Sequence, residues 1–265
     1  MKNRIVILIF IVLVCLSVIA CAAGRANHEK ASGHITVGMA LIKSEMYTDA
    51  LRELFAAEEL TPNDPVVHYY LGIAYLGKNA RDRAMKEFQK AVSLNPDYSE
   101  AHNYLGILYM EQQHWDLAIS SFDRALANIL YDTPSVSLYN KGWALYRKGD
   151  YKKALISYKS AARMNDALTL MPQIEKNMGL VLLALGENRE ALSHFSEAIN
   201  LVPDFPEAQY WLALTNVRLK QYNEATQILQ DMIQNKSSQS EYVTKGQQML
   251  EQIRLGKYDE LLWRP

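Results

Sequence analysis

The chain has 265 residues, of which 49% are hydrophobic and 22% charged, which suits a folded body and excludes a disordered chain. Without the first 20 residues, which contain Lys2 and Arg4, 26 of the 28 basic residues remain against 29 acidic ones, a balance of −3. Such a body lacks the basic excess that a non-specific nucleic-acid binder needs. The two cysteines, Cys15 and Cys21, both lie near the N-terminus, so the body has no disulfide framework and no thiolate metal site.

The first 21 residues have the pattern of a lipoprotein signal peptide. Two basic residues precede a mostly apolar run, Ile5 to Ala20, which is shorter than the roughly 20 residues of a comfortable membrane span and suits a signal-peptide core. The run ends in Val18-Ile19-Ala20-Cys21, which resembles a bacterial lipobox, where a small residue precedes a lipidated cysteine. Ile19 departs from the more frequent alanine or serine, and an uncleaved membrane anchor with an incidental Cys21 is the alternative.

The lipobox resemblance implies cleavage after residue 20 and lipidation of Cys21. A diacylglyceryl group and a further acyl chain give stable membrane attachment, where a single chain is marginal. Ala22 stands where an aspartate would favour retention in the inner membrane. The expected location is therefore the bacterial cell envelope, on the periplasmic face of the outer membrane, with residues 21–30 as a short polar tether.

A repeat of about 34 residues follows. When Gly38, Gly72, Gly106, Gly142 and Gly179 are aligned, six units begin at Ala31, Pro65, Ser99, Ser135, Pro172 and Pro206. Position 20 of every unit is alanine: Ala50, Ala84, Ala118, Ala154, Ala191 and Ala225. Position 24 is large and apolar or aromatic: Leu54, Phe88, Phe122, Tyr158, Phe195 and Leu229. Position 27 is Ala57, Ala91, Ala125, Ala161, Ala198 and Met232, and Pro62, Pro96 and Pro203 occupy position 32.

This pattern has a physical basis in stacked helical hairpins. Glycine or alanine at position 8 and alanine at position 20 let the two helices of a hairpin approach closely, and the large residue at position 24 fills the gap to the next hairpin. Proline at position 32 ends the second helix. Because one hairpin cannot bury its own apolar face, neighbouring hairpins stack to form the core.

The pattern is identified as the tetratricopeptide repeat, which implies an all-α superhelix, an α-solenoid of six helical hairpins over residues 31–237. Tyr242, Met249, Leu250 and Ile253 predict a capping helix over Glu241–Arg254, within a C-terminal segment 238–265. The sequence leaves open whether Leu261, Leu262 and Trp263 fold back.

Three histidines recur at position 4 of successive repeats: His34, His68 and His102. Metal binding is the alternative to packing, but successive equivalents are separated by about one helix pair, roughly 10 Å or more, which is too far for a shared tetrahedral ion. The sequence also lacks a nucleophile elbow, a phosphate-binding glycine loop and a dinucleotide fingerprint. We therefore expect no enzyme activity, catalytic residue, cofactor or metal.

The first helix of each hairpin supplies the candidate peptide-binding groove at positions 2, 5, 9 and 12. The main candidates are Met39, Tyr69, Ile73, Leu76, Asn103, Ile107, Met110, Tyr139, Trp143, Tyr146, Leu180, Tyr210 and Leu214. The same positions include Ile35, Ile42, Val66, Val136, Leu183 and Val217. We expect about half of these side chains to pack inside the superhelix. The other half would form an exposed apolar surface larger than a soluble monomer usually has. The expected ligand is an amphipathic helix or an extended apolar peptide anchored by aromatic side chains. Only Asn103 suits a clamp for a C-terminal carboxylate.

An insertion between repeats three and four indicates a particular group of tetratricopeptide repeat proteins. The spacing between repeats three and four grows by two residues at Leu130-Tyr131-Asp132-Thr133-Pro134, with Gly142 and Trp143 following. This segment is similar to one in the pilotin-type lipoproteins of type IV pilus biogenesis, although an ordinary loop insertion is the alternative. The resemblance implies an outer-membrane protein that pilots or stabilises the secretin, with a secretin segment in the groove. The alternative function is an adaptor for peptidoglycan hydrolases or for outer-membrane protein assembly.

Overall fold

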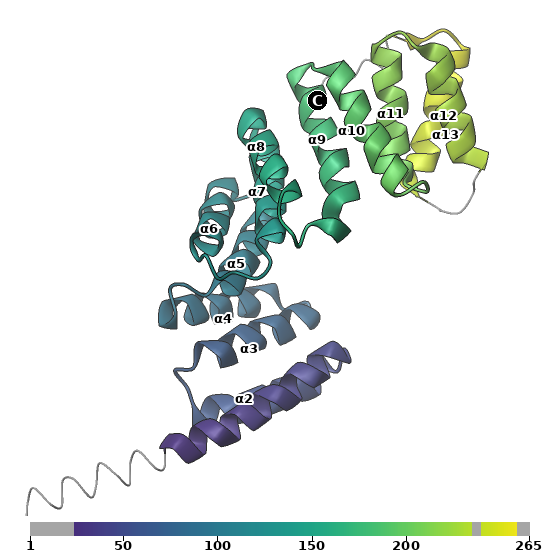
Figure 1. The fold of residues 1–265 in the computed structure, drawn as a ribbon. Coiled ribbons are helices and arrows are strands. Elements are labelled where there is room, and N and C mark those ends of the chain that lie inside the picture. The colour runs from purple at the N-terminus through teal and green to yellow at the C-terminus, as the bar shows by residue number, and fades with distance from the viewer. Residues whose placement is uncertain (1–23, 235–239, 259–265) are drawn as a thin grey trace, which may run out of the picture. The chain divides into compact units, whose positions relative to one another are not determined.

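The computed structural model describes residues 24–234 and 240–258, and within these ranges all regular structure is helical (Figure 1). The signal peptide, Cys21 and the tail residues Leu261 to Trp263 lie outside the described residues. None of the helices in the described ranges is both long and apolar enough to cross a membrane. The helical fold class that the repeat predicts is confirmed.

Residues 24–43 are helical and pair with α2 (Tyr47–Leu60). The other elements are α3 (Pro65–Gly77), α4 (Arg81–Leu94), α5 (Ser99–Glu111), α6 (Trp115–Ala127), α7 (Pro134–Lys148), α8 (Tyr151–Ala162), η1 (Leu168–Leu170), α9 (Met171–Leu185), α10 (Asn188–Leu201), α11 (Pro206–Arg218), α12 (Tyr222–Gln234) and α13 (Glu241–Arg254). The first helices of hairpins two to six therefore begin within one residue of the predicted repeat starts. The first helix includes residues 24–30, so helix already occupies most of the segment expected to be the tether.

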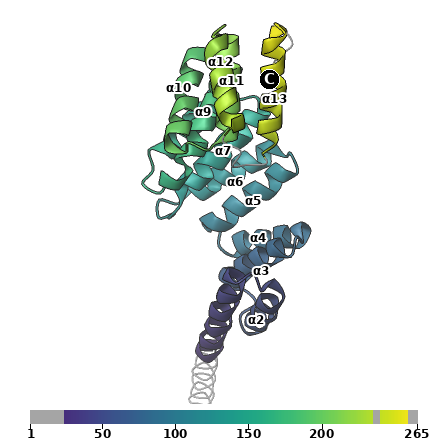
Figure 2. The ribbon, with the colours of Figure 1, turned by 90° about the vertical axis from the view of Figure 1, so that its right-hand side faces the viewer.

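The helices form two compact units, Met1–Leu108 and Tyr109–Pro265, with the boundary inside α5. In the first unit α3 packs against both α2 and α4. In the second, consecutive helices pack from α6 through to α13, and Figures 1 and 2 show α9 with α10 and α11 with α12 side by side. Each hairpin covers an apolar face of its neighbour within its unit, as a solenoid requires.

The core consists of the positions that define the repeat. The residues at positions 20 and 24 are all 0% exposed, from Ala50 and Leu54 in repeat one to Ala225 and Leu229 in repeat six. These side chains form the interior of the hairpins together with other buried apolar residues, such as Val67, Leu71 and Ile174, which are also 0% exposed.

The large side chain at position 24 lies on the glycine of its own hairpin. A Cβ on Gly72 would come within 2.6 Å of the Phe88 ring, and one on Gly179 within 2.6 Å of Phe195. The expected close approach of the two helices is confirmed, and it is this ring that requires the glycine. Phe88 also stacks on Tyr104 of the next hairpin at 5.1 Å, so one side chain joins two hairpins.

Position 15 forms the turn inside every hairpin and has a left-handed backbone. Its φ values are 60° at Glu45, 58° at Asn79, 60° at Gln113, 92° at Gly149, 82° at Gly186 and 61° at Lys220. Only repeats four and five place glycine there, the residue that adopts this conformation without steric cost. The other four repeats have residues that adopt it at a cost of roughly 1 kcal/mol each.

The side chain at position 4 ties the first helix to its surroundings. His68 and His102 donate from Nε2 to the carbonyls of Pro62 and Pro96, at 2.9 and 2.8 Å. Gln209 donates in the same way to the carbonyl of Pro203, at 3.2 Å. The proline at position 32 thus ends one helix and presents its carbonyl to the next repeat, which satisfies a buried donor.

The spacings from repeat three to four and from repeat four to five are longer than 34 residues, and the additional residues lie between the helices. In the six-residue loop between α6 and α7, Tyr131 is buried and accepts a hydrogen bond from the Ser137 hydroxyl at 3.1 Å. The residues before it, Ile129 and Leu130, are 95% and 81% exposed. At the second longer spacing, η1 takes up the extra residues between α8 and α9.

Residues Glu241–Arg254, where the sequence predicts a capping helix, form α13. Met249, Leu250 and Ile253 are buried in a cluster with Leu229 and Met232 of α12. Ser240 caps its N-terminus by accepting a hydrogen bond from the backbone N–H of Tyr242. The exposed face of this helix is polar, as the end of a repeat array requires.

Candidate peptide-binding surface

The first unit presents a group of tyrosines around Tyr69 on α3. Its ring lies 5.0 Å from Tyr70, 5.0 Å from Tyr98 and 6.0 Å from Tyr104. Burial raises the pKa of Tyr69, Tyr70 and Tyr98, so their hydroxyls stay protonated at physiological pH. These rings form a half-buried, uncharged aromatic surface.

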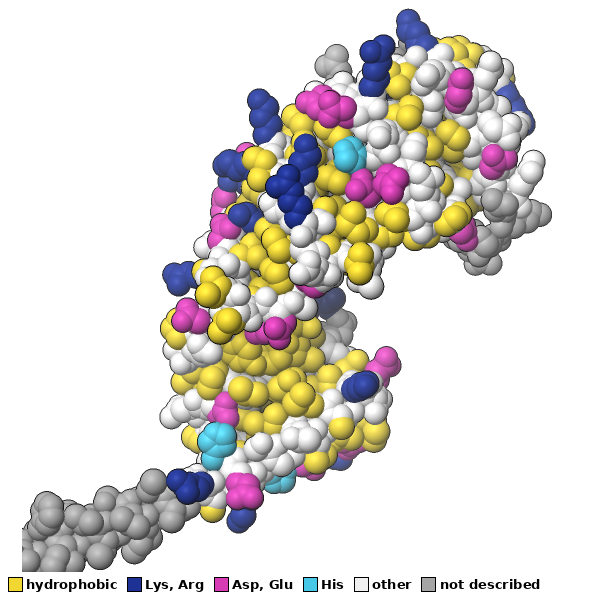
Figure 3. Space-filling view, in the orientation of Figure 1, with side chains coloured by type: hydrophobic (Ala, Val, Ile, Leu, Met, Phe, Trp, Pro, Cys, Tyr) yellow, Lys and Arg dark blue, Asp and Glu magenta, His cyan; other side chains and the backbone are white. Residues whose placement is uncertain are grey.

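The predicted groove residues of the first unit extend this surface. Ile73, Leu76 and Ile107 are half-buried, and Met39 is 42% exposed. Figure 3 shows hydrophobic side chains gathered over α3 and the helices next to it. This arrangement suits an apolar ligand, because half-buried side chains can lose further contact with water when a partner binds.

The second unit has a separate surface on α7. Trp143 stacks on Tyr146 with ring centres 5.4 Å apart, and Tyr146 lies 5.6 Å from Tyr151. The guanidinium of Arg147 lies 5.2 Å from the Trp115 ring centre and 5.6 Å from that of Trp143. We call Trp115, Trp143, Tyr146 and Arg147 the aromatic–arginine cluster. Its rings are half-buried and Arg147 is exposed.

A second arginine reaches the cluster from α11. Arg218 occupies the same repeat position as Arg147, whereas the repeat between them has the small Ala184 there. Its Nη1 donates to the Leu183 carbonyl at 3.4 Å. Burial raises the pKa of Tyr146, while the positive charges of both arginines act to lower it. The Tyr146 hydroxyl therefore lies in the field of two guanidinium groups.

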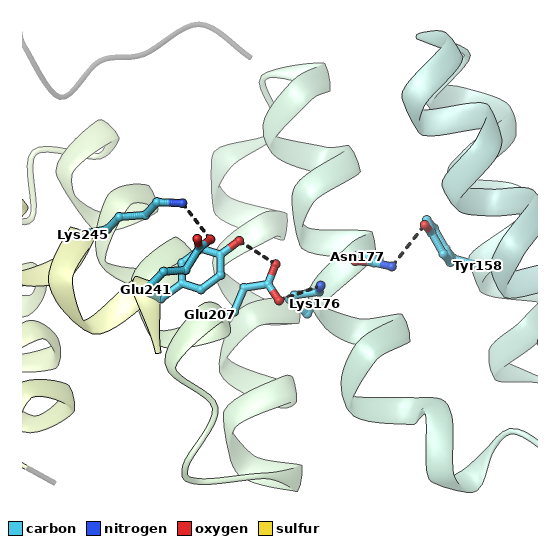
Figure 4. A network of polar contacts seen from close by, with 7 residues as sticks. Tyr158, Lys176, Asn177, Glu207, Glu241 and Lys245 are labelled. Carbon is cyan, nitrogen blue, oxygen red and sulfur yellow. Dashed lines mark hydrogen bonds and ion pairs between the residues drawn. The ribbon is translucent and has the colours of Figure 1, made fainter. Parts of the chain in front are cut away.

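A polar network crosses α9, α11 and α13 (Figure 4). Glu207 accepts hydrogen bonds from Lys176 Nζ at 3.1 Å and from the Tyr242 hydroxyl at 3.1 Å. Lys245 pairs with Glu241 at 3.0 Å and lies 4.7 Å from the Tyr242 ring centre. Beside this network Tyr210 is half-buried and contacts Tyr242 at 5.6 Å. The network joins the last repeat to the capping helix, and its charges are mutually paired.

Family models described as tetratricopeptide repeat match residues 65–98, 97–167 and 182–250. The chain is a tetratricopeptide repeat protein. A comparison of the sequence with curated proteins gave no significant match.

Solved structures share the fold of this repeat protein. PilF of Pseudomonas aeruginosa superposes with a TM-score of 0.72 at 16% identity, over 84% of this chain and 99% of PilF. PilW, described as a widely conserved type IV pilus biogenesis factor, gives a TM-score of 0.71 at 20% identity, over 81% of this chain and 97% of PilW. YrrB, described as a tetratricopeptide repeat protein with an unusual peptide-binding site, gives 0.60 at 20% identity, over 74% and 97%. At these identities the likeness shows the fold.

Several predicted groove residues are core residues instead. Leu180 and Leu214 are 6% and 3% exposed and belong to apolar clusters, and Asn103 is 6% exposed. The remaining candidates in the second unit and at its boundary, Met110, Tyr139 and Tyr210, are half-buried. We therefore do not retain Leu180 and Leu214 as ligand contacts. The physical reason is that α9 and α11 are enclosed by neighbouring helices, so that Ile174 to Leu183 are all buried. The sequence indicates the burial of Leu180 by the run Leu180-Val181-Leu182-Leu183, because a helix that is apolar all round is buried.

The histidines of the repeat protein pair within their own hairpins. His34 lies 2.7 Å from Glu53 and His68 2.8 Å from Glu87, while in repeat five the order is reversed and His194 lies 2.7 Å from Glu175. No group of three or more His, Cys, Asp or Glu side chains in the described residues could hold a metal ion. The regular spacing of the histidines therefore reflects a recurring link between the two helices of a hairpin.

Sequence reasoning missed Trp115 and Arg147 as functional candidates. Trp115 begins α6, the second helix of its hairpin, whereas the groove was expected on first helices. Arg147 lies at position 13, one residue after the last expected groove position. A signal was present, because Tyr146 and Arg147 lie three and four residues after Trp143 on one helix, so that each of them neighbours Trp143.

Proposed function

We propose that this tetratricopeptide repeat protein is a lipid-anchored scaffold of the outer membrane that binds and supports the secretin in type IV pilus biogenesis. The observation that carries the proposal is its structural correspondence to PilF and PilW over 99% and 97% of their lengths. Tetratricopeptide proteins are typically binding scaffolds, and we propose that this one has no enzymatic activity. The half-buried aromatic surfaces in both units are suited to binding peptide segments of a partner.

The lipid anchor is the second part of the proposal. It rests on the lipobox-like Val18 to Cys21. Anchoring close to the first repeat would hold the aromatic surfaces near the membrane in which a secretin assembles. The resulting high local concentration of the secretin would allow binding even if the affinity of the aromatic surfaces for it is modest.

The test is a chromosomal Cys21→Ala substitution in the native bacterium, with Cys15→Ala as the matched control. We expect Cys21→Ala to release the protein from the membrane fraction and to reduce the heat-resistant secretin multimers seen by gel electrophoresis, while Cys15→Ala changes neither. Intact secretin multimers in a strain that lacks the whole gene would refute the secretin role. A protein that stays in the membrane after Cys21→Ala would refute the lipid anchor.

A further inference from the structure

Arg147 differs from several lysines of the second unit in what it contacts. Five lysines of the second unit have a carboxylate oxygen within 4 Å: Lys141, Lys148, Lys153, Lys176 and Lys245. In the described part of the chain, Arg147 has neither an ion pair nor a hydrogen bond, and it contacts the indole rings of Trp115 and Trp143. Its charge is therefore held in place without being neutralised.

Two rings from different helices fix the position of this guanidinium. Trp115 belongs to α6 and Trp143 to α7, and Trp143 is itself held by stacking on Tyr146. A guanidinium lying against aromatic rings loses little further freedom on binding, and its N–H groups point outward in its own plane, where a carboxylate can accept two of them. Arg147 is thus a preorganised donor for a planar anion.

The surroundings favour a negative ligand. Arg218 contributes a second positive charge near Tyr146. The nearby Asp116 and Asp150 are both within 4.0 Å of Lys148 Nζ, at 2.5 and 4.0 Å, so their charges are opposed locally. Together these groups leave an excess of positive charge at the cluster.

Apolar surface approaches Arg147 from two helices. At the start of α6, a depression of about 340 Å³ is lined by Gln113, His114, Trp115, Asp116, Leu117 and Lys148, and its apolar contacts come from Trp115 and from Leu117, which is 50% exposed. On α7, the rings of Trp143 and Tyr146 continue to Tyr151. A chain that crosses Arg147 would therefore meet apolar surface before and after it. This favours an internal segment over a chain terminus, which would use one side only.

We propose that the aromatic–arginine cluster binds an Asp or Glu side chain flanked by apolar residues, in an internal segment of the protein partner. Arg147 pairs with the carboxylate, while the depression beside Trp115 and the rings of Trp143 and Tyr146 receive the apolar neighbours. This inference rests on the proposed protein-binding function and adds the chemistry of the segment that is recognised.

The experiment selects a random peptide library displayed on phage against the full-length protein in detergent micelles, without reference to any secretin. The peptides enriched are then synthesised in four forms: with the acidic residue, with that residue changed to its amide, and each with a free or an amidated C-terminus. Their dissociation constants are measured by fluorescence anisotropy for the wild type, Arg147→Gln, Arg147→Lys and the exposed-site control Arg189→Gln.

We expect the enriched peptides to contain an Asp or Glu next to apolar residues. Arg147→Gln should weaken binding of the acidic form by roughly tenfold to a hundredfold, in line with a charge-assisted hydrogen-bonded pair. Arg147→Lys should restore part of this affinity, and Arg189→Gln should not alter it. The amide form should bind the wild type and Arg147→Gln equally, as a double-mutant cycle requires.

Three results would overturn the inference: enriched peptides without acidic residues, an unchanged affinity of Arg147→Gln for the acidic form, or loss of binding on amidation of the C-terminus. The last result would identify a carboxylate-terminus site. The outcome is independent of the secretin assay, since the peptide selection can succeed when the secretin proves not to be the partner, and can fail when it is.

Discussion

The Nδ1 atom of His68 lies 2.8 Å from a carboxylate oxygen of Glu87, inside a hairpin where the histidine is 3% exposed. The other ring nitrogen faces the Pro62 carbonyl at 2.9 Å. Both neighbours are acceptors, so the doubly protonated ring satisfies both, whereas the neutral ring satisfies only one. The hydrogen bond to Glu87 is the main cause that raises the pKa of His68 above 6.5, against the opposing effect of burial.

This pair predicts a pH-dependent stability. Because the folded-state pKa is raised, the stabilisation from His68 is fully present below the unfolded pKa of about 6.5 and is lost as the pH rises through the folded pKa. The wild type should therefore have a higher free energy of unfolding than His68→Gln. This difference should be larger at about pH 5.5 than at about pH 8.5. Urea denaturation followed by circular dichroism measures both.

His68→Gln is a conservative change, because Gln209 already fills the equivalent position and donates to the Pro203 carbonyl. The exposed His114→Gln serves as the control and should show no such difference. A gap between wild type and His68→Gln that stays constant or widens with rising pH would contradict the assignment.

The left-handed turn at position 15 predicts opposite effects of two substitutions. Gly149→Ala should lower the free energy of unfolding by about 1–2 kcal/mol, because its φ of 92° is unfavourable for a side chain. Lys220→Gly, at a φ of 61°, should raise the free energy by about 0.5–1 kcal/mol. Chemical denaturation measures the free energy of unfolding of each variant.

Gly33→Ala is the matched control for this pair. Gly33 is exposed within the first helix, and a Cβ there would meet nothing within 4 Å, so alanine should stabilise by about 1 kcal/mol. A stabilising Gly149→Ala would show that the turn does not need its left-handed conformation.

The contact between Gly72 and Phe88 predicts a non-additive pair. Gly72→Ala places a Cβ within 2.6 Å of the ring and should destabilise by about 1–3 kcal/mol. Phe88→Leu alone leaves space beside Gly72 and should also destabilise. The double variant should lose less than the sum of the two, because repeat six has this combination in Ala213 and Leu229, both fully buried. Additive losses in thermal or chemical denaturation would mean that the two positions do not share the space between the helices.

The rings of α7 predict a loss of partner capture. Replacing Trp143 and Tyr146 by aspartate should abolish recovery of the partner from detergent-solubilised envelopes, because both half-buried rings would present charge to an apolar segment. The helical circular dichroism signal should be unchanged. Ile156→Asp, at a side chain 64% exposed on α8, is the control and should leave capture intact. Capture that survives the double substitution would move the site to another surface, with the exposed Ile129 and Leu130 as the first to test.

The sequence by itself determined the hairpins and their boundaries. Alanine at position 20, a large residue at position 24 and proline at position 32 lie within 12 residues of one another, as Ala84, Phe88 and Pro96 do, so their spacing alone specifies where two helices meet and where they end. The same local logic located α13. The exposure of a side chain on a first helix was decided by the tertiary structure, since it depends on how many neighbouring helices enclose that helix. Leu180 and Leu214 satisfy the groove pattern and are buried, whereas Trp115 and Arg147 fall outside that pattern and meet across two helices. Contacts between different repeats have no fixed spacing along the chain, and for this reason the aromatic–arginine cluster is visible only in the folded protein.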